Sequence, residues 1–320
     1  MKIDISIVIP VYNEEKNIPL LYTELAKVLS SLERACEVIM VDDGSKDASW
    51  EELLKVAHTD PRVKLLRHGR NMGLTQAYQN GFDHASGDYI LIFAADLEND
   101  ASEIIRVVQK LDEGFDVVNT NRVGRWGSAS RKVPSKAANF LIEKVTGVAL
   151  KDNGSGLKGF RAFVVKNLKM YGEMHRYFAA FSSVYTNRIT EIDVAYRERI
   201  YGKSAYGSLS RTFKVFLDLF SLKFLVLMSK KPYSLMPGRL FGSIGIGMFT
   251  GGLISTAILL VDKFAYGHDI GGRPLLTFSF LLIVLGAQFV MTGLLGELIM
   301  RVYFESGGRK VYTVKEEVNF

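Results

Sequence analysis

Two stretches near the end of the chain contain no charged residue, and they constrain the fold more than any other feature. They span Leu240–Val261 and Leu275–Leu295. Each is about 20 residues long, which is the length that an α-helix needs to cross a hydrocarbon core of roughly 30 Å. A buried core helix is the alternative for either run alone. Two such runs joined by the short loop 262–274 favour a transmembrane hairpin within 236–300, with helices at about 240–261 and 275–297.

Basic residues flank both outer ends of the predicted hairpin. They are Lys230, Lys231 and Arg239 before it and Arg301, Arg309 and Lys310 after it. The loop between the runs also carries Lys263 and Arg273, so the difference in basic charge between the two ends of the hairpin is moderate. An excess of Lys and Arg outside the hairpin still favours the cytoplasmic side for both chain ends. We therefore expect a multi-pass protein of the inner (plasma) membrane, with residues 1–207 and the tail 301–320 in the cytoplasm.

An amphipathic stretch precedes the hairpin, in the region 208–235. Its large apolar residues recur at helical spacing: Phe213, Phe216, Leu217, Phe220, Phe224 and Leu227. Lys214, Asp218 and Lys223 lie largely off that stripe. An ordinary packed helix is one interpretation. Its place next to a membrane span favours a helix in the membrane interface, with its apolar face at the headgroup boundary.

The N-terminal part of the chain contains short apolar runs that end abruptly in polar residues. Ile5–Val11, Val38–Val41 and Tyr89–Ala94 have the length and composition of buried parallel strands. Helical patterns occupy 17–30, 48–58, 75–84 and 101–112, and further strands are predicted at 63–66 and 116–119. This alternation predicts an α/β domain with a mostly parallel sheet.

Ligands of open α/β sheets bind at the carboxyl ends of the strands. The first two runs place Tyr12, Asn13, Glu14, Asp42 and Asp43 there. These hydrogen-bond acceptors are better suited to binding a base and ribose, or a metal ion, than to binding a phosphate directly. The third run leads to Asp96 and Glu98, whose carboxylates can face one Mg²⁺ or Mn²⁺ ion that also bridges substrate phosphates. A solvated acidic turn before a helix is the alternative.

Three segments at these strand ends carry a resemblance to a known family. IVIPVYNEE, VDDGS and AADLEND resemble signatures of inverting glycosyltransferases with the GT-A fold. The polyprenyl-phosphate branch, which includes dolichyl-phosphate mannose synthase and bacterial undecaprenyl-phosphate glucosyltransferases, is the more similar one. Further matching segments are Arg70–Ala77, Asp152–Arg161, Gly172–Tyr177, Arg199–Ser204 and Gly308–Glu316. The resemblance covers nearly the whole chain and implies a GT-A (Rossmann-like) nucleotide-sugar domain in 1–207, followed by the interfacial helix and the hairpin.

The resemblance also implies roles for individual residues. The nucleotide-binding set comprises Pro10, Tyr12, Asn13, Glu14, Asp42, Asp43, Asn71, Gly73, Ala95 and Asp96. The acceptor-phosphate set comprises Arg122, Arg131, Ser135, Arg199 and Lys203, and the acceptor pocket comprises Asp152, His175 and Arg176. The predicted catalytic residues are Asp96, Arg122 and Arg131, and the predicted metal ligands are Asp96 and Glu98.

Arg122 and Arg131 belong to a glycine- and serine-rich segment, 121–132, that carries four basic residues. By composition it is a mobile solvated loop, but its place after the strand 116–119 makes it a candidate anion clamp, because arginine suits bidentate phosphate contacts. A polyprenyl phosphate has a second pKa of about 6 and is largely dianionic at neutral pH. Transfer to it therefore requires positioning and stabilisation of the leaving group more than a strong base.

The sequence departs from the family pattern at four positions. Where the family carries Asp-x-Asp, this chain has Ala94 before Asp96, so the first acid is missing. Glu98 stands where Gln is common, and it is a candidate replacement ligand. Ser155 and Ala205 stand where many relatives carry Cys and Lys.

Several functions remain open at this point. The resemblance to bacterial undecaprenyl-phosphate glucosyltransferases implies a hexosyltransferase that moves glucose from UDP-glucose to undecaprenyl phosphate for cell-envelope glycans, with GDP-mannose or UDP-aminoarabinose as alternative donors. A processive polysaccharide synthase fits less well, because two spans are few for a polymer channel and no Gln-x-x-Arg-Trp sequence occurs. An inactive membrane scaffold is the third class, which the missing acid at Ala94 keeps open.

Two further expectations concern partners and chemistry. Relatives of this kind form tetramers, so a homo-oligomer is implied. Nucleic acid is not an expected partner, because the basic residues form no aromatic-interleaved stripe or recognition motif. The single cysteine, Cys36, lies inside the second apolar run and is predicted to be a small buried hydrophobe.

Overall fold

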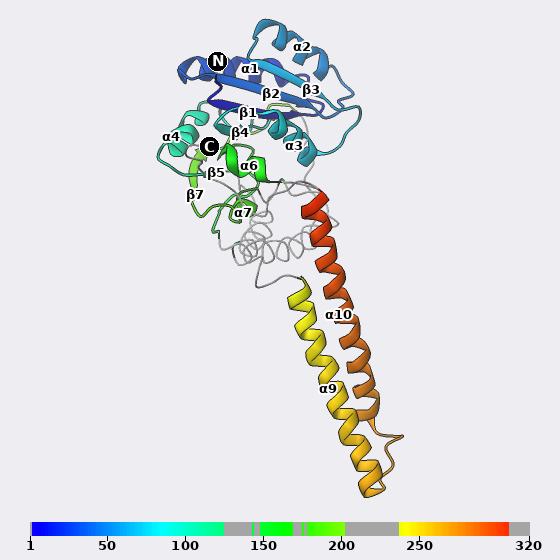
Figure 1. The fold of residues 1–320 in the computed structure, drawn as a ribbon. Helices are drawn as coiled ribbons and strands as arrows, with labels where there is room; N and C mark the ends of the chain where they lie inside the picture. Colours follow the sequence, from blue (N-terminus) through cyan, green and yellow to red (C-terminus); the bar gives the residue numbers. More distant parts are fainter. Residues whose placement is uncertain are drawn as a thin grey trace. The chain divides into compact units, whose positions relative to one another are not determined.

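The computed structural model describes residues 2–124, 143, 148–168, 175, 178–201 and 237–306, with the side chains there except those of 180, 237 and 300–306. These residues belong to two compact units, one within 2–201 and one within 237–306. Figure 1 shows an α/β fold for the first unit and a helical hairpin for the second.

The first unit is built on one seven-stranded sheet with the order β3-β2-β1-β4-β6-β5-β7. The strands are β1 Ile5–Val11, β2 Cys36–Asp42, β3 Val63–Arg67, β4 Tyr89–Ile92, β5 Val117–Val123, β6 Lys158–Arg161 and β7 Ile189–Ala195. Strands β3, β2, β1 and β4 run parallel, as do β5 and β7. Strand β6 is antiparallel to both of its neighbours. The predicted α/β sheet, mostly parallel, is therefore confirmed.

Helices cover both faces of the sheet. They are α1 Ile18–Ser31, α2 Ser49–Thr59, α3 Leu74–His84, α4 Glu103–Asp112, α6 Ala162–Asn167 and α7 Phe178–Ser182. One core joins alternate residues of β1, such as Ile7, to α1, α2 and α4. The other joins Val8 to α3, α6 and α7. Since successive side chains of a strand point to opposite faces, burial of both faces explains why the strands are continuous apolar runs.

The observed elements correct the predicted boundaries in one important place. The predicted helices agree within two residues, but the strand predicted at 116–119 continues to Val123 as β5. Asn121 and Arg122 therefore pair with Asp193 and Val194 of β7, and they are not part of a loop as the segment 121–132 predicted. Strands β6 and β7 were not predicted, because both are short or polar on one side.

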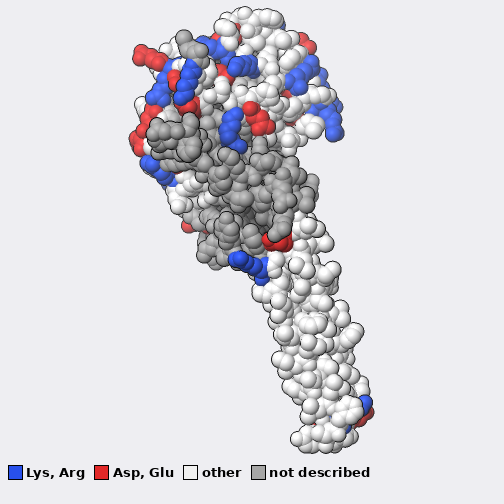
Figure 2. Space-filling model, viewed as in Figure 1, with Lys and Arg blue, Asp and Glu red and all other residues white. Residues whose placement is uncertain are grey.

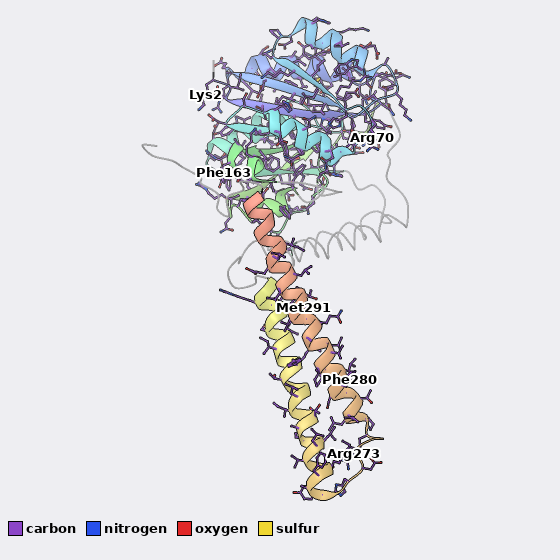
Figure 3. All side chains as sticks on the ribbon, turned by 45° about the vertical axis from the view of Figure 1, so that its right-hand side comes forward. Lys2, Arg70, Phe163, Arg273, Phe280 and Met291 are labelled. Carbon is purple, nitrogen blue, oxygen red and sulfur yellow. The ribbon has the colours of Figure 1, made fainter. Side chains whose placement is uncertain are left out.

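The second unit consists of two long helices, α9 Pro237–Tyr266 and α10 Pro274–Ser306. Within them, Gly238–Tyr266 and Pro274–Ile299 are long and apolar enough to cross a membrane, and only 17% of the most apolar stretch of each is buried. Apolar side chains such as Phe280 and Met291 point away from the hairpin (Figure 3), and charged residues are almost absent from its visible surface (Figure 2). This exposure is not that of a core helix, and it agrees with the predicted hairpin.

Glycines allow the two long helices to approach closely. A Cβ atom on Gly245 would lie 2.7 Å from the carbonyl oxygen of Gly286, and one on Gly286 would lie 2.5 Å from the backbone nitrogen of Phe249. Gly247 and Gly251 face elsewhere, because a Cβ on either would meet nothing within 4 Å. Small residues at such contacts are typical of membrane helix pairs.

Candidate active site

The turns that follow β1 and β2 are tied to each other by short polar contacts. The backbone N–H of Asn13 donates to Ser45 Oγ at 3.0 Å, and the N–H of Lys46 donates to Asn13 Oδ1 at 2.9 Å. The N–H of Glu14 donates to Ser49 Oγ at 2.8 Å. Asn13 adopts a φ of 56°, a left-handed conformation that Asn tolerates better than most residues. The predicted residues Asn13 and Glu14 therefore sit in a defined turn beside the end of β2.

Asp42 and Asp43 lie at the end of β2, and Asp43 is held mainly by backbone donors. Asp43 accepts hydrogen bonds from the N–H groups of Met72 at 2.7 Å and Gly73 at 2.9 Å. His68 Nδ1 lies 2.8 Å from the same carboxylate. Asp42 accepts a bond from the N–H of Ser45 at 3.0 Å, and its Oδ2 forms an ion pair with Arg67 Nε at 3.1 Å. In this structure Asp43 thus fixes the loop that carries Asn71 and Gly73, two other predicted nucleotide-binding residues.

An open depression of about 770 Å³ lies beside these turns. Its lining residues are Tyr12, Gly44, Ser45, Lys46, Arg67, His68, Gly69, Arg70 and Asn71. Tyr12 and Asn71 were predicted for the nucleotide, whereas the basic side chains were not. Arg70 is visible at this end of the sheet in Figure 3. The carboxyl end of β3 supplies Arg67 and His68, which were not predicted for the site although the strand at 63–66 was.

The depression depends on a close backbone approach at Gly44. This residue has a φ of +71°, and a Cβ atom there would lie 2.5 Å from the backbone carbon of Arg70. Pro10 and Ala95, also predicted for the nucleotide, are buried residues at or near the ends of β1 and β4. They support these turns from below.

The loop after β4 brings two predicted metal ligands together. Leu97 has a φ of 59°, and the N–H of Glu98 donates to Asp96 Oδ1 at 3.2 Å. Arg199, which follows β7, bridges the two acids: its Nη2 lies 2.7 Å from Asp96 Oδ2 and its Nε lies 2.8 Å from Glu98 Oε1. We call Asp96 and Glu98 the acid pair.

Burial affects the protonation of the acids at this end of the sheet. Desolvation raises the pKa of Asp96, the charge of Glu98 raises it further, and Arg199 lowers it only in part. Desolvation also raises the pKa of Glu14, which the hydrogen bond from Asn17 opposes. Burial therefore makes each of these carboxyl groups harder to ionise than an exposed one, although Asp96 already pairs with Arg199.

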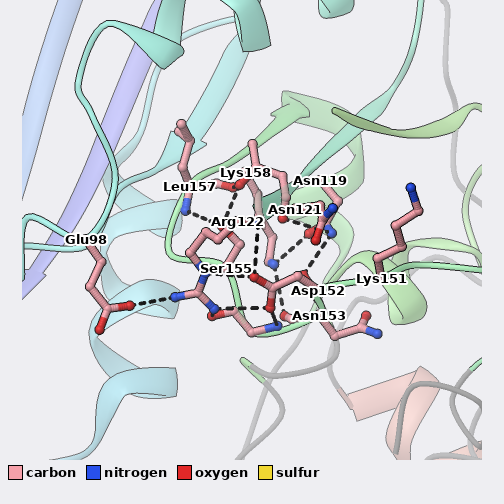
Figure 4. A network of polar contacts seen from close by, with 12 residues as sticks. Glu98, Asn119, Asn121, Arg122, Lys151, Asp152, Asn153, Ser155, Leu157 and Lys158 are labelled. Carbon is pink, nitrogen blue, oxygen red and sulfur yellow. Dashed lines mark hydrogen bonds and ion pairs between the residues drawn. The ribbon is translucent and has the colours of Figure 1, made fainter. Parts of the chain in front are cut away.

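Arg122 is placed differently from the prediction. Its side chain is only 3% exposed, and its guanidinium is committed to protein acceptors. Nε donates to Asp152 Oδ2 and Nη1 donates to Glu98 Oε2, each at 2.7 Å. Nη2 donates to Asp152 Oδ1 at 3.1 Å and to the carbonyl of Gly154 at 2.7 Å (Figure 4). Arg122 thus connects the acid pair to Asp152, and it does not present a free anion-binding face.

A buried lysine that the sequence argument did not single out completes this network. Lys158, on β6, is 1% exposed, and its Nζ donates to Asn119 Oδ1 at 2.7 Å and to the carbonyl of Asn153 at 3.0 Å. Asn119 in turn donates to Glu191 at 2.7 Å, and Glu191 accepts the N–H groups of Lys151 and Asp152. The segment 151–154 is therefore held from several sides. Its motif was recognised, but nothing in the motif indicated a buried charge.

The loop that bears the acid pair packs directly on this segment. A Cβ atom on Gly156 would lie 2.6 Å from Ala94 Cβ and 3.2 Å from Asn99 Nδ2. Position 94, where the family pattern has an acid, is therefore close to the backbone at 156. Within the described ranges, the Asn99 amide has no hydrogen-bond partner although the residue is 1% exposed.

The remaining predicted residues divide into two groups. His175 Nδ1 lies 2.8 Å from Thr75 Oγ1, in the first turn of α3. Arg131, Ser135, Arg176 and Lys203 lie outside the described residues, as do Ala205 and the predicted interfacial helix. Among the described residues, no three His, Cys, Asp or Glu side chains form a protein-only metal site. The acid pair still fits Mg²⁺, which commonly takes one or two carboxylates and completes its shell with water and substrate phosphate, and Arg199 shows that the pair accepts a cation.

The comparison with known sequences agrees with this architecture. The profile of glycosyl transferase family 2 matches residues 6–169. The chain belongs to this family of glycosyltransferases.

Two curated relatives and one solved structure refine the picture. The chain is 37% identical over 319 residues to dodecaprenyl-phosphate galacturonate synthase of Rhizobium johnstonii, covering 98% of this chain and 93% of the relative. It is 35% identical over 316 residues to undecaprenyl-phosphate 4-deoxy-4-formamido-L-arabinose transferase of Salmonella choleraesuis, with the same coverage. Glucosyl-3-phosphoglycerate synthase of Mycobacterium tuberculosis, solved with Mg²⁺ and UDP, has a TM-score of 0.52 at 18% identity and covers 68% of this chain and 79% of that one. The first two support a polyprenyl-phosphate sugar transferase, and the third shows the GT-A fold.

Proposed function

We propose that this protein transfers a sugar from a nucleoside diphosphate to polyprenyl phosphate at the cytoplasmic face of the inner membrane. The observation that carries the proposal is the match to polyprenyl-phosphate sugar transferases over 98% of the chain, hairpin included. A soluble acceptor would not require the two long apolar helices. The same helices would anchor the enzyme in the membrane that holds a lipid acceptor.

The identity of the sugar is a separate proposal. UDP-glucose was favoured by the sequence pattern, but the names of the two relatives specify galacturonate and 4-deoxy-4-formamido-L-arabinose. We therefore rank UDP-linked sugars of these two types ahead of glucose, and GDP-mannose after it. The basic depression lined by Lys46, Arg67 and Arg70 supports an anionic donor of either base.

The described residues suggest how the chain would promote transfer. The acceptor phosphate is the nucleophile and is already anionic, so the protein need not remove a proton from it. Asp96 and Glu98 would hold a divalent cation, which supplies charge neutralisation for the departing diphosphate. Arg199 lies beside that pair and offers a phosphate-binding guanidinium. Arg131, Ser135 and Lys203 remain proposed acceptor contacts.

For Arg122 we propose a positioning role in place of the direct phosphate contact. Its buried guanidinium fixes Glu98 and Asp152 relative to each other. Asp152 would then line the sugar or acceptor side of the site. His175, bonded to Thr75, is proposed as an acceptor-pocket residue and not as a base.

The proposal is tested with the full chain in detergent, short polyprenyl phosphates and a panel of radiolabelled nucleotide sugars. The expected product is soluble in organic solvent and releases its sugar in mild acid. An Asp96→Asn preparation is the matched control. A polymeric product would favour the processive synthase. Binding of the donors without transfer to any lipid would favour the inactive scaffold.

Topology and assembly are proposed from the hairpin and the family resemblance. Cysteines introduced at Gly267, in the loop between α9 and α10, and at Ser306, at the end of α10, should be labelled from opposite sides of the membrane. Labelling of both from one side would contradict the hairpin. Light scattering of the purified protein tests the proposed tetramer.

A further inference from the structure

Two arginines hold the acid pair, and they are bound very differently. The Arg122 side chain is 3% exposed and reaches Glu98, Asp152 and the carbonyl of Gly154 at once. The Arg199 side chain is 24% exposed and contacts only the two carboxylates among the bonds described above. Removing Arg122 would take from Asp152 the guanidinium that binds both of its oxygens, and Glu98 would keep Arg199 as a partner. Moving Arg199 would free one oxygen of Asp96 and one of Glu98.

Arg199 occupies the position of a cation between the two carboxylates. Its Nη2 and Nε reach one oxygen of each acid at 2.7 and 2.8 Å, so one cationic group contacts both carboxylates. The Asp96 side chain is 15% exposed and the Glu98 side chain 9% exposed. Two anions that are this poorly solvated require a compensating charge, because an unpaired buried charge is strongly destabilising.

We infer that Arg199 is an exchangeable internal cation: it neutralises the acid pair until a divalent ion takes its place, and its guanidinium is then released to a phosphate group. This inference rests on the proposed metal site at Asp96 and Glu98. The negative charge of the acid pair stays neutralised during the exchange, because one cation replaces the other. It also couples the two binding events, since the planar fork of arginine is suited to bidentate phosphate contacts once the carboxylates are occupied.

The segment around Arg199 is positioned for such an exchange. The N–H of Arg197 donates to the carbonyl of Glu98 at 3.0 Å, so the backbone of this segment stays attached to the acidic loop. The Arg197 side chain bonds Glu24 at 2.9 Å and also Asp100, and neither acid belongs to the pair. The backbone can therefore remain in place while only the side chain of Arg199 moves.

The first test is the affinity for Mn²⁺ alone, measured by electron paramagnetic resonance on the full chain in detergent. Arg199→Gln removes the competing charge and should bind Mn²⁺ roughly tenfold more tightly than the wild type, the effect of about one charge-assisted hydrogen bond. Arg199→Lys should fall between the two. Arg197→Gln is the matched control, since it lies two residues away and contacts other acids; its Mn²⁺ affinity should equal that of the wild type.

The outcomes separate the exchange from the metal site itself. Mn²⁺ affinity that is unchanged or weaker in Arg199→Gln, while Asp96→Asn abolishes binding, overturns the exchange and leaves the metal site standing. Absence of Mn²⁺ binding by the wild type and by Arg199→Gln overturns both. A thermal melt of each variant confirms that a loss of binding is not a loss of folding.

The second test identifies the phosphate that receives the guanidinium. UDP binding at saturating Mn²⁺ is measured by calorimetry, and KM for a short polyprenyl phosphate is measured separately. A tenfold loss of UDP affinity in Arg199→Gln assigns the guanidinium to the nucleotide diphosphate. A similar rise in KM with normal UDP affinity assigns it to the lipid phosphate. If neither changes, the released guanidinium has no phosphate partner and that half of the inference is wrong.

Discussion

The ends of β2 and β4 each carry two acids, but the protein holds them with different chemistry. At the end of β2, Asp43 is bound by the N–H groups of Met72 and Gly73 and by His68. At the end of β4, Asp96 and Glu98 are bound by the guanidinium groups of Arg122 and Arg199. Asp43 organises a loop, whereas Asp96 and Glu98 are neutralised by arginine side chains, of which Arg199 is the more exposed.

This difference shows which half of the site is rigid and which is adjustable. A backbone N–H cannot leave its acceptor unless the loop itself rearranges, so Asp43 is fixed before any ligand arrives. An arginine side chain can change partners by rotating a few bonds, while the charge that it leaves must be compensated. We therefore expect nucleotide recognition to be preformed and the events at the acid pair to depend on a cation.

Removal of the buried arginine should have the largest effect. Arg122→Ala leaves Glu98 and Asp152 buried without their shared partner, which should destabilise the first unit by about 3–5 kcal/mol. Arg106→Ala is the control, because the Arg106 side chain is 53% exposed and its ion pair with Glu103 should contribute about 0–1 kcal/mol. Urea unfolding followed by tryptophan fluorescence measures both. Equal stability of the two variants would mean that the network around Arg122 is not needed for folding.

Loss of the acid pair should affect catalysis next most strongly. Asp96→Asn should lower transfer by about a hundredfold or more at ordinary Mg²⁺ or Mn²⁺, because the cation that stabilises the leaving group loses a ligand. Glu98→Gln should weaken metal affinity. Initial rates across a range of Mn²⁺ concentrations measure both effects. Full activity of Asp96→Asn in EDTA would show that the pair does not serve a metal.

A substitution of Asp43, at the end of β2, should have a smaller effect, which is confined to nucleotide affinity. Asp43→Asn replaces one acceptor oxygen by an N–H donor, so the bond from Gly73 or Met72 is lost. We expect UDP affinity to fall by about tenfold, with little change in KM for the lipid. Calorimetric titration of UDP tests this, with Asp112→Asn as a control, because Asp112 is half exposed and binds Arg34. A selective rise in the lipid KM would reverse the assignment of the two halves.

The smallest predicted effect is on stability as a function of pH. Because the pKa of Asp96 is raised in the folded protein, its ionisation favours the unfolded chain above the ordinary carboxyl pKa, and the deficit grows until the folded pKa is passed. Without metal, Asp96→Asn should therefore melt slightly higher than the wild type near pH 7. The difference should shrink as the pH falls toward the ordinary carboxyl range. A lower melting temperature for Asp96→Asn at pH 7 would mean that attraction to Arg199 outweighs desolvation.

The sequence predicted the strands and helices well for a physical reason. Burial of the sheet on both faces produces continuous apolar runs, and the polar residues that follow them mark the ligand-binding edge. Strand β6 escaped prediction because it has four residues and carries Lys158, a charged residue buried by its partners Asn119 and Asn153.

The partners of Arg122 could not be predicted from the sequence either. It bonds Asp152, which is 30 residues away, and Glu98, which is 24 residues away. Both contacts arise only when the strands are in register. Composition indicated a basic loop around Arg122, whereas the loop after β4 and the segment before β6 bring Glu98 and Asp152 against it.

The burial of Cys36 has a practical consequence for experiments on the membrane part. This single cysteine of the chain lies in β2 with 5% exposure, and desolvation raises the pKa of its thiol, so little reactive thiolate forms at neutral pH. Maleimide reagents should leave the native protein unmodified. Labelling of cysteines introduced on the hairpin can then be measured without interference from Cys36. Because Cys36 need not be replaced, the sheet keeps its natural packing.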